Sequence, residues 1–153
     1  MKKITANGFH TSSIIIGFLA TLMIVFPALV LKDSETSYTG LQIAFGHEFA
    51  SLGPWASGEI KFNPITLIAY LLPLVGSLLL LFTKKGYLSS TVIFLIAAIL
   101  LFLTPQFTVV TVTVLGNANE IDVNWTYGIG LIIAASLSVF GVMVGMARIS
   151  KQA

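Results

Sequence analysis

Four long stretches without a charged residue constrain this chain more than any other feature. They cover residues 4–31, 62–83, 86–119 and 123–147. A mostly apolar stretch of about 18 residues or more can cross a bilayer as a helix. Only 9% of the residues are charged and 56% are hydrophobic, whereas soluble domains average about 25% charged. The sequence therefore predicts an integral membrane protein and excludes a soluble globular domain and a disordered chain.

The fold class we expect is an all-α membrane protein, one domain over residues 1–153, whose four transmembrane helices form an antiparallel bundle. The expected spans are residues 13–31, 65–82, 88–104 and 127–147. Asn63 is a natural N-cap for the second span, as Asn124 is for the fourth, and Pro64 suits a first helical position. Pro73 predicts a kink within the second span, and Pro105 predicts the end of the third.

The charged residues predict which end of each helix faces the cytoplasm. The segments assigned to the inside carry only basic residues, namely Lys2, Lys3, Lys84, Lys85, Arg148 and Lys151. Those assigned to the outside carry two basic and six acidic residues, namely Lys32, Lys61, Asp33, Glu35, Glu48, Glu59, Glu120 and Asp122. Lysine and arginine in short loops favour the cytoplasmic side. We therefore expect a multi-pass protein of the cell membrane with both termini in the cytoplasm.

The two outer segments, about residues 32–63 and 105–124, carry patterns typical of β-strands. Residues 41–45 and 59–62 alternate between apolar and polar, with turn residues between them. Residues 107–115 are rich in valine and threonine and favour a strand, although they also allow a helical extension of the third span. These patterns predict a small extracellular β-sheet on the bundle.

Small residues follow one face of the fourth span. Ala134, Ser138, Gly141 and Gly145 have helical spacing. Such residues let membrane helices approach closely. Packing within the bundle is favoured over a homodimer interface.

The sequence offers little reactive chemistry. The expected spans contain no acidic residue, lysine, arginine or histidine, which argues against a stand-alone ion pump or proton-coupled transporter. The chain has no cysteine, and the expected topology places His10 and His47 on opposite sides of the membrane. His47 and Glu48, with Glu59, Asp33 and the acidic residues near position 120, form a disfavoured candidate for an external cation site. We expect no catalytic residues, no metal and no cofactor.

Three aromatic residues are predicted to anchor the protein at the membrane interface. They are Trp55, Trp125 and Tyr127. Tryptophan and tyrosine are enriched where the apolar core of a bilayer meets the headgroups.

One part of the chain resembles a known group of proteins. The segment Tyr38–Gly46, the tripeptide Phe62-Asn63-Pro64 and the segment Ile68–Gly76 look like small four-span membrane proteins common in low-GC Gram-positive bacteria. The resemblance covers the first two spans and their loop, and it implies no activity or catalytic residue. The layout of four helices with a long first outer loop also resembles the claudin architecture. The claudin signature tryptophans and loop cysteines are missing, so this likeness implies nothing about function.

The sequence therefore predicts a non-enzymatic membrane protein with a structural, accessory or partner-binding role. A small transporter or channel component, and a bacteriocin-immunity or envelope-stress protein, are the alternatives. The expected partners are the lipid bilayer and either further copies of the chain or a larger membrane protein, and not nucleic acid.

Overall fold

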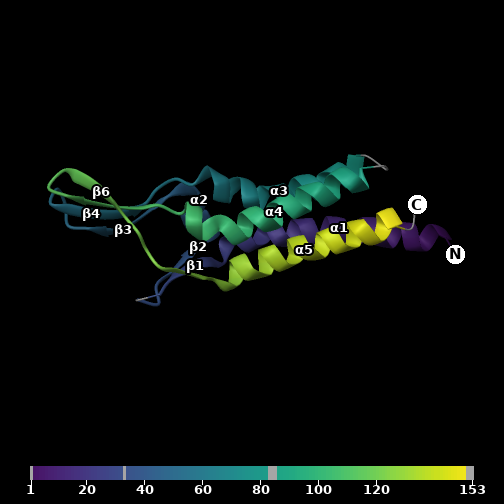
Figure 1. The fold of residues 1–153 in the computed structure, drawn as a ribbon, viewed down its shortest axis with the longest axis horizontal. Coiled ribbons are helices and arrows are strands. Elements are labelled where there is room, and N and C mark those ends of the chain that lie inside the picture. Colours follow the sequence, from purple (N-terminus) through teal and green to yellow (C-terminus); the bar gives the residue numbers. More distant parts are fainter. Residues whose placement is uncertain (1, 33, 83–85, 151–153) are drawn as a thin grey trace.

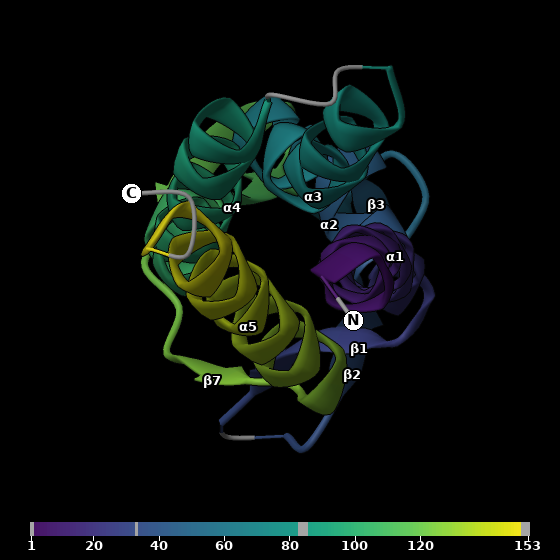
Figure 2. The same ribbon diagram turned by 90° about the vertical axis from the view of Figure 1, so that its right-hand side faces the viewer.

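The computed structural model describes residues 2–32, 34–82 and 86–150 and is mostly helical (Figure 1). Its long helices are α1 (Lys2–Leu22), α3 (Pro64–Phe82), α4 (Tyr87–Phe107) and α5 (Ile129–Ser150). Helices α1 and α4 each pack against both α3 and α5, which closes a ring of four helices (Figure 2). Both termini lie at one end of this bundle, and the strands lie at the other (Figure 1).

Three of these helices are long and apolar enough to span a membrane. They are α3, α4 and α5. Between 39% and 44% of the residues in the most apolar stretch of each helix are buried inside the protein, so more than half are at least partly exposed. The outward residues include large apolar side chains such as Ile96, Phe102, Phe140 and Met143. A water-soluble protein does not expose apolar surface on this scale.

The expected first span, residues 13–31, has the wrong boundaries. Helix α1 begins at Lys2 and ends at Leu22, and the short 3-10 helix η1 (Met23–Val25) follows it. Pro27 then begins strand β1 (Pro27–Leu31). The residue before a proline is pushed out of the helical region, and Phe26 indeed has extended backbone angles of φ −93° and ψ 164°. The apolar helical stretch His10–Val25 is consequently shorter than the other three.

The strands form two sheets, whereas the sequence predicted one. Sheet A has the order β2-β1-β7, with β2 at Ser37–Thr39 and β7 at Trp125–Tyr127. Sheet B has the order β3-β4-β5-β6, with β3 at His47–Ser51, β4 at Ala56–Ile60, β5 at Val110–Val114 and β6 at Asn117–Ile121. All neighbouring strands are antiparallel. The class "all-α" is therefore too narrow for this fold.

Local expectations in the outer segments had mixed outcomes. Residues 41–45, expected as a strand, belong to helix α2 (Gly40–Phe45). The reason is a capping box, in which the Thr39 side chain accepts from the Gln42 amide and the Gln42 side chain accepts from the Thr39 amide. Residues 110–114 do form a strand, while α4 continues past Pro105 to Phe107.

The two expected helix caps also differ in outcome. Asn63 caps α3, because its Oδ1 accepts a hydrogen bond from the Thr66 amide at 3.1 Å, and Pro64 is the first residue of that helix. Asn124 does not cap α5, because strand β7 intervenes and the helix begins only at Ile129.

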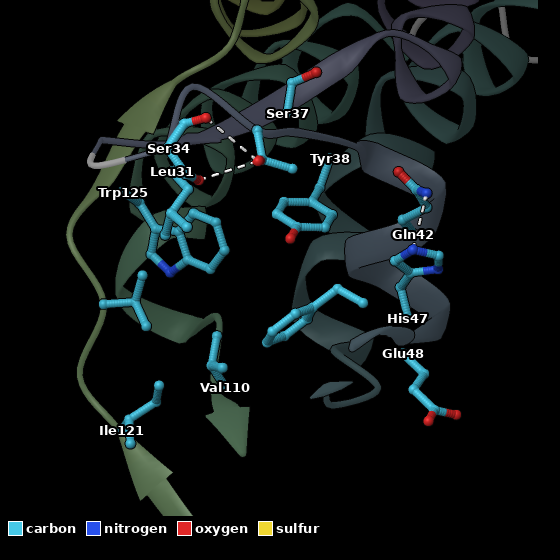
Figure 3. A pocket seen from close by; sticks show the side chains of 13 residues that line it. Leu31, Ser34, Ser37, Tyr38, Gln42, His47, Glu48, Val110, Ile121 and Trp125 are labelled. Atoms are coloured by element: carbon cyan, nitrogen blue, oxygen red, sulfur yellow. Dashed lines mark hydrogen bonds between the residues drawn. The ribbon is translucent and has the colours of Figure 1, made fainter. Parts of the chain in front are cut away.

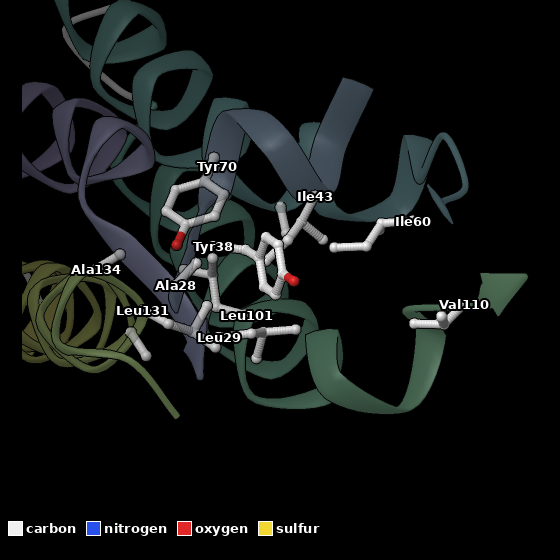
Figure 4. Close-up of a cluster of buried hydrophobic side chains, with 12 residues drawn as sticks. Ala28, Leu29, Tyr38, Ile43, Ile60, Tyr70, Leu101, Val110, Leu131 and Ala134 are labelled. Atoms are coloured by element: carbon white, nitrogen blue, oxygen red, sulfur yellow. The ribbon is translucent and has the colours of Figure 1, made fainter. Parts of the chain in front are cut away.

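One apolar core joins the bundle to both sheets (Figure 4). Leu29 of β1, Ile43 of α2, Leu101 of α4 and Leu131 of α5 are almost completely buried in it. The core therefore packs sheet A, α2 and the nearer end of sheet B against the ends of the helices.

Candidate functional site

A cleft of about 500 Å³ lies between the two sheets (Figure 3). This volume falls within the range of small-ligand and side-chain pockets, roughly 300–1,000 Å³. The residues that line it are Leu31, Ser34, Thr36, Ser37, Tyr38, Gln42, His47, Glu48, Phe49, Val110, Ile121, Val123 and Trp125. Seven of these are aromatic or aliphatic, and none is lysine or arginine.

The aromatic wall of the cleft is centred on Tyr38. Its ring lies 5.9 Å from the Trp125 ring and 6.2 Å from the Phe49 ring, both in edge-on contacts. These distances suit favourable aromatic pairs. The three rings come from β2, β3 and β7, so the wall forms only when both sheets are in place. The Tyr38 side chain is 6% exposed, and this burial raises the pKa of its phenol above the ordinary value.

Polar side chains lie at two margins of the cleft, with Gln42, His47 and Glu48 on one side and Ser34 near Trp125 on the other (Figure 3). The Gln42 Oε1 is held by the capping box, so its Nε2 is directed to His47 Nε2, 3.5 Å away. On the other side, the Ser34 hydroxyl donates to Thr36 Oγ1 at 3.0 Å. The cleft thus combines an apolar floor with hydroxyl, amide and imidazole groups at its rim. Such a surface suits a mostly apolar group that enters from solvent.

The candidate cation site at His47 and Glu48 is not assembled. Across residues 2–32, 34–82 and 86–150, no group of three or more metal-ligating side chains is present. Asp33, one of the candidates, lies outside the described residues. Glu120 instead forms an ion pair with Lys61 at 3.1 Å. His10 lies far away in α1, where its ring nitrogen contacts the Leu80 carbonyl oxygen.

The four small residues of α5 are all buried within the chain. Gly141 faces α4, since a Cβ on it would lie 2.6 Å from the Phe94 ring. Gly145 also faces α4, where its neighbour is Thr91. The Ser138 hydroxyl donates to the Ala134 carbonyl at 2.9 Å.

Pro73 is buried inside α3, which continues unbroken to Phe82. Because proline has no N–H, Pro73 cannot donate to the Ala69 carbonyl four residues before it. The Ser77 hydroxyl donates to the Leu74 carbonyl at 2.8 Å and not to that of Ala69. The expected kink stays a prediction.

The three expected membrane anchors occupy different environments. Trp55 lies in the β3–β4 turn, and its side chain is 67% exposed. Strand β4 leads from this turn back towards α3, so five strand residues, about 16 Å at 3.3 Å each, separate Trp55 from the outer end of the helices. Trp125 belongs to the cleft wall, and the Tyr127 hydroxyl donates to the Phe102 carbonyl at 2.8 Å. Of the three, Tyr127 lies next to a membrane-length helix and Trp55 lies at the far turn of sheet B, and their role as membrane anchors stays a prediction.

The sequence did not identify the cleft. Tyr38, Gln42 and Phe49 come from three elements whose meeting depends on the pairing of strands far apart in the chain. One local signal was available, because Thr39 and Gln42 have the spacing of a capping box.

No family model, curated protein or solved structure matches the chain. The resemblances to small four-span bacterial proteins and to the claudin architecture therefore stay predictions.

Proposed function

We propose that the chain is a four-span, non-catalytic membrane protein that binds a partner polypeptide in the cleft between its two sheets. Sheets A and B together with α2 are called the outer module below. The observation that carries the binding role is the cleft itself, with aromatic walls contributed by both sheets and a polar rim. In protein–protein interfaces, apolar side chains of one partner that fill a pocket on the other carry much of the binding energy.

The fourth span in this proposal is α1, supported by its packing. It packs against both α3 and α5 (Figure 2). Thr21 donates to the Tyr70 carbonyl near the outer end, and His10 contacts Leu80 near the other end. The apolar stretch His10–Val25 covers roughly 25 Å at helical rise, so α1 crosses most of the bilayer with its neighbours.

The proposed orientation places the sheets outside and both termini inside the cell. It is supported by Lys2 and Arg148, which lie in α1 and α5 at the end opposite the sheets. In the sequence, Lys84 and Lys85 fall in the short segment between α3 and α4, and lysine and arginine in short loops favour the cytoplasmic side.

The topology can be tested cleanly because the chain has no cysteine. Ser51→Cys at the end of β3 and Ser150→Cys at the end of α5 introduce the same thiol at exposed positions. A membrane-impermeant maleimide should label the first variant in intact cells and the second only after permeabilisation. Labelling of Ser150→Cys in intact cells would contradict the proposed orientation.

The cleft can be tested with Trp125 as a built-in reporter. A Trp55→Phe variant in nanodiscs keeps Trp125 as its single tryptophan. N-acetyl-phenylalaninamide, a probe for an apolar side chain, should shift the Trp125 emission to the blue in a saturable way. The matched Trp125→Phe variant, which retains only Trp55, should show no saturable shift.

A second pair of variants separates the cleft from general apolar surface. Phe49→Ala removes a cleft wall, whereas Phe45→Ala removes an exposed phenylalanine of α2 that does not line the cleft. We expect only Phe49→Ala to weaken probe binding. Equal affinity in both variants would refute the cleft as the binding site.

A further inference from the structure

A row of acidic side chains crosses the polar face of sheet B. Glu48 of β3 pairs directly with Glu59 of β4. Glu59 in turn pairs with Thr111 of β5, and Thr111 pairs with Glu120 of β6. Directly opposed residues of antiparallel strands point to the same face. Three carboxylates and one hydroxyl therefore form a single line, which we call the acidic row.

The Glu48–Glu59 end of the acidic row is electrostatically unfavourable in the isolated chain. Both side chains are exposed, and like charges directly opposite each other on a sheet are destabilising. Within the part of the chain that the structure describes, no basic side chain forms an ion pair with either carboxylate. A binding partner that supplied positive charge here would remove this repulsion.

The other end of the acidic row already binds an ammonium group. Lys61 follows β4 and Glu120 lies on β6, and their charged atoms are 3.1 Å apart. Strand β5 lies between these two strands, so the ion pair crosses it. The chain thus contains one example of a lysine side chain seated on this row.

The hydroxyl of Thr111 is the second feature that indicates a ligand. Thr111 is 2% exposed, and its Oγ1 has no hydrogen-bond partner. It lies on the row between Glu59 and Glu120. A buried hydroxyl without a partner is destabilising, and an ammonium or guanidinium group placed beside it would donate the missing hydrogen bond.

We propose that the acidic row docks a basic polypeptide segment, with lysine or arginine side chains seated between Glu48 and Glu59 and beside Thr111. The composition of the outer segments complements such a partner, since they carry six acidic and two basic residues. The proposal does not rest on the cleft, because Val110 and Ile121 of the cleft pair with each other next to Thr111 and Glu120. Successive residues of a strand point to opposite faces, so Thr111 and Glu120 lie on the face of sheet B opposite Val110 and Ile121, whereas Glu48 is common to the row and the cleft because it also lines the cleft.

The test measures binding of a fluorescent decalysine peptide to the full chain in phosphatidylcholine nanodiscs. We expect anisotropy to rise saturably at low ionic strength, with an affinity that falls as salt is added. Empty nanodiscs should give no rise. Glu59→Gln should lower the affinity about two- to fivefold, as expected for loss of one exposed ion pair.

Glu35→Gln is the matched control, because it removes the same charge from an exposed residue between β1 and β2, away from the acidic row. It should leave the affinity unchanged. Equal losses in the two variants would mean that net charge alone attracts the peptide, and would overturn the proposal. Absence of saturable binding to the unaltered chain would also overturn it.

Thr111→Val provides a readout that misfolding cannot mimic. The substitution keeps the shape of the side chain and removes the unpartnered hydroxyl, so the unfolding temperature should rise. The affinity for decalysine should fall in the same variant. An unchanged affinity would overturn the role of Thr111, whereas the Trp125 response to N-acetyl-phenylalaninamide reports on the cleft separately.

Discussion

The ring nitrogen Nε2 of His10 lies 2.6 Å from the Leu80 carbonyl oxygen and joins α1 to α3 at the end of the bundle that carries both termini. The same ring makes an edge-on contact with Tyr87 of α4, at 6.4 Å between centroids. Arg148 of α5 lies over the Tyr87 ring, 5.3 Å from its centroid. One histidine therefore connects, directly or through Tyr87, all four long helices. We regard it as a structural residue.

His10→Ala should destabilise the bundle by about 1 kcal/mol, the typical net contribution of one hydrogen bond, together with a smaller loss from the aromatic contact. The measurement is thermal unfolding in nanodiscs, followed by circular dichroism. His10→Gln, which can still donate to the Leu80 carbonyl, is the control and should recover part of the loss. Unchanged unfolding of His10→Ala would show that this contact does not stabilise the bundle.

Two glycine substitutions should have opposite effects on stability. Gly141→Ala places a Cβ 2.6 Å from the Phe94 ring and forces α4 and α5 apart, so it should destabilise by about 1–3 kcal/mol. Gly8→Ala meets no atom within 4 Å in the described structure and replaces glycine in a helix. It should stabilise by roughly 0.5–1 kcal/mol. Unfolding of both variants under the same conditions checks the prediction, and equal effects would argue against close packing of α4 and α5 at Gly141.

The sequence predicted the membrane-length helices well because their signal is local. Charge-free apolar stretches need no partner to be recognised, and α3, α4 and α5 lie close to the expected spans. Asn63 and Pro64 likewise mark the start of α3 through chemistry within one turn. Pro27 was an equally local signal, and it explains why the first span ends earlier than expected.

The sheets and the cleft were less predictable because they depend on distant pairing. Strand β1 lies between β2 and β7, which begin at Ser37 and Trp125. No residue pattern within β2 or β7 specifies that β1 is its neighbour. The acidic row has the same origin, since Glu48, Glu59 and Glu120 meet only through the register of four strands.

The two tryptophans should differ in their access to solvent. Trp55 is 67% exposed at the far turn of sheet B, whereas Trp125 is half-buried between the sheets. Acrylamide should therefore quench a Trp125→Phe variant, which reports Trp55, more strongly than a Trp55→Phe variant. Nanodiscs with a spin-labelled headgroup provide a second measurement and should quench Trp55 weakly. Strong quenching by the lipid label would place Trp55 at the bilayer surface and contradict this prediction.

Burial of Tyr38 should make the outer module less stable at alkaline pH. Its pKa is raised by desolvation above the ordinary value of 10.0, so the folded state holds the phenolic proton more tightly than the unfolded state does. The resulting stabilisation is fully present below about pH 10 and is lost as pH rises through the folded-state pKa. Tyr38→Phe cannot ionise, so its unfolding free energy should decline less steeply above this pH than that of the unaltered chain. Both proteins carry Trp55→Phe, and one of them also carries Tyr38→Phe. Their chemical denaturation is measured between pH 8 and pH 11 through the fluorescence of Trp125, whose ring lies 5.9 Å from that of Tyr38. Parallel declines in the two proteins would show that ionisation of Tyr38 is not linked to folding.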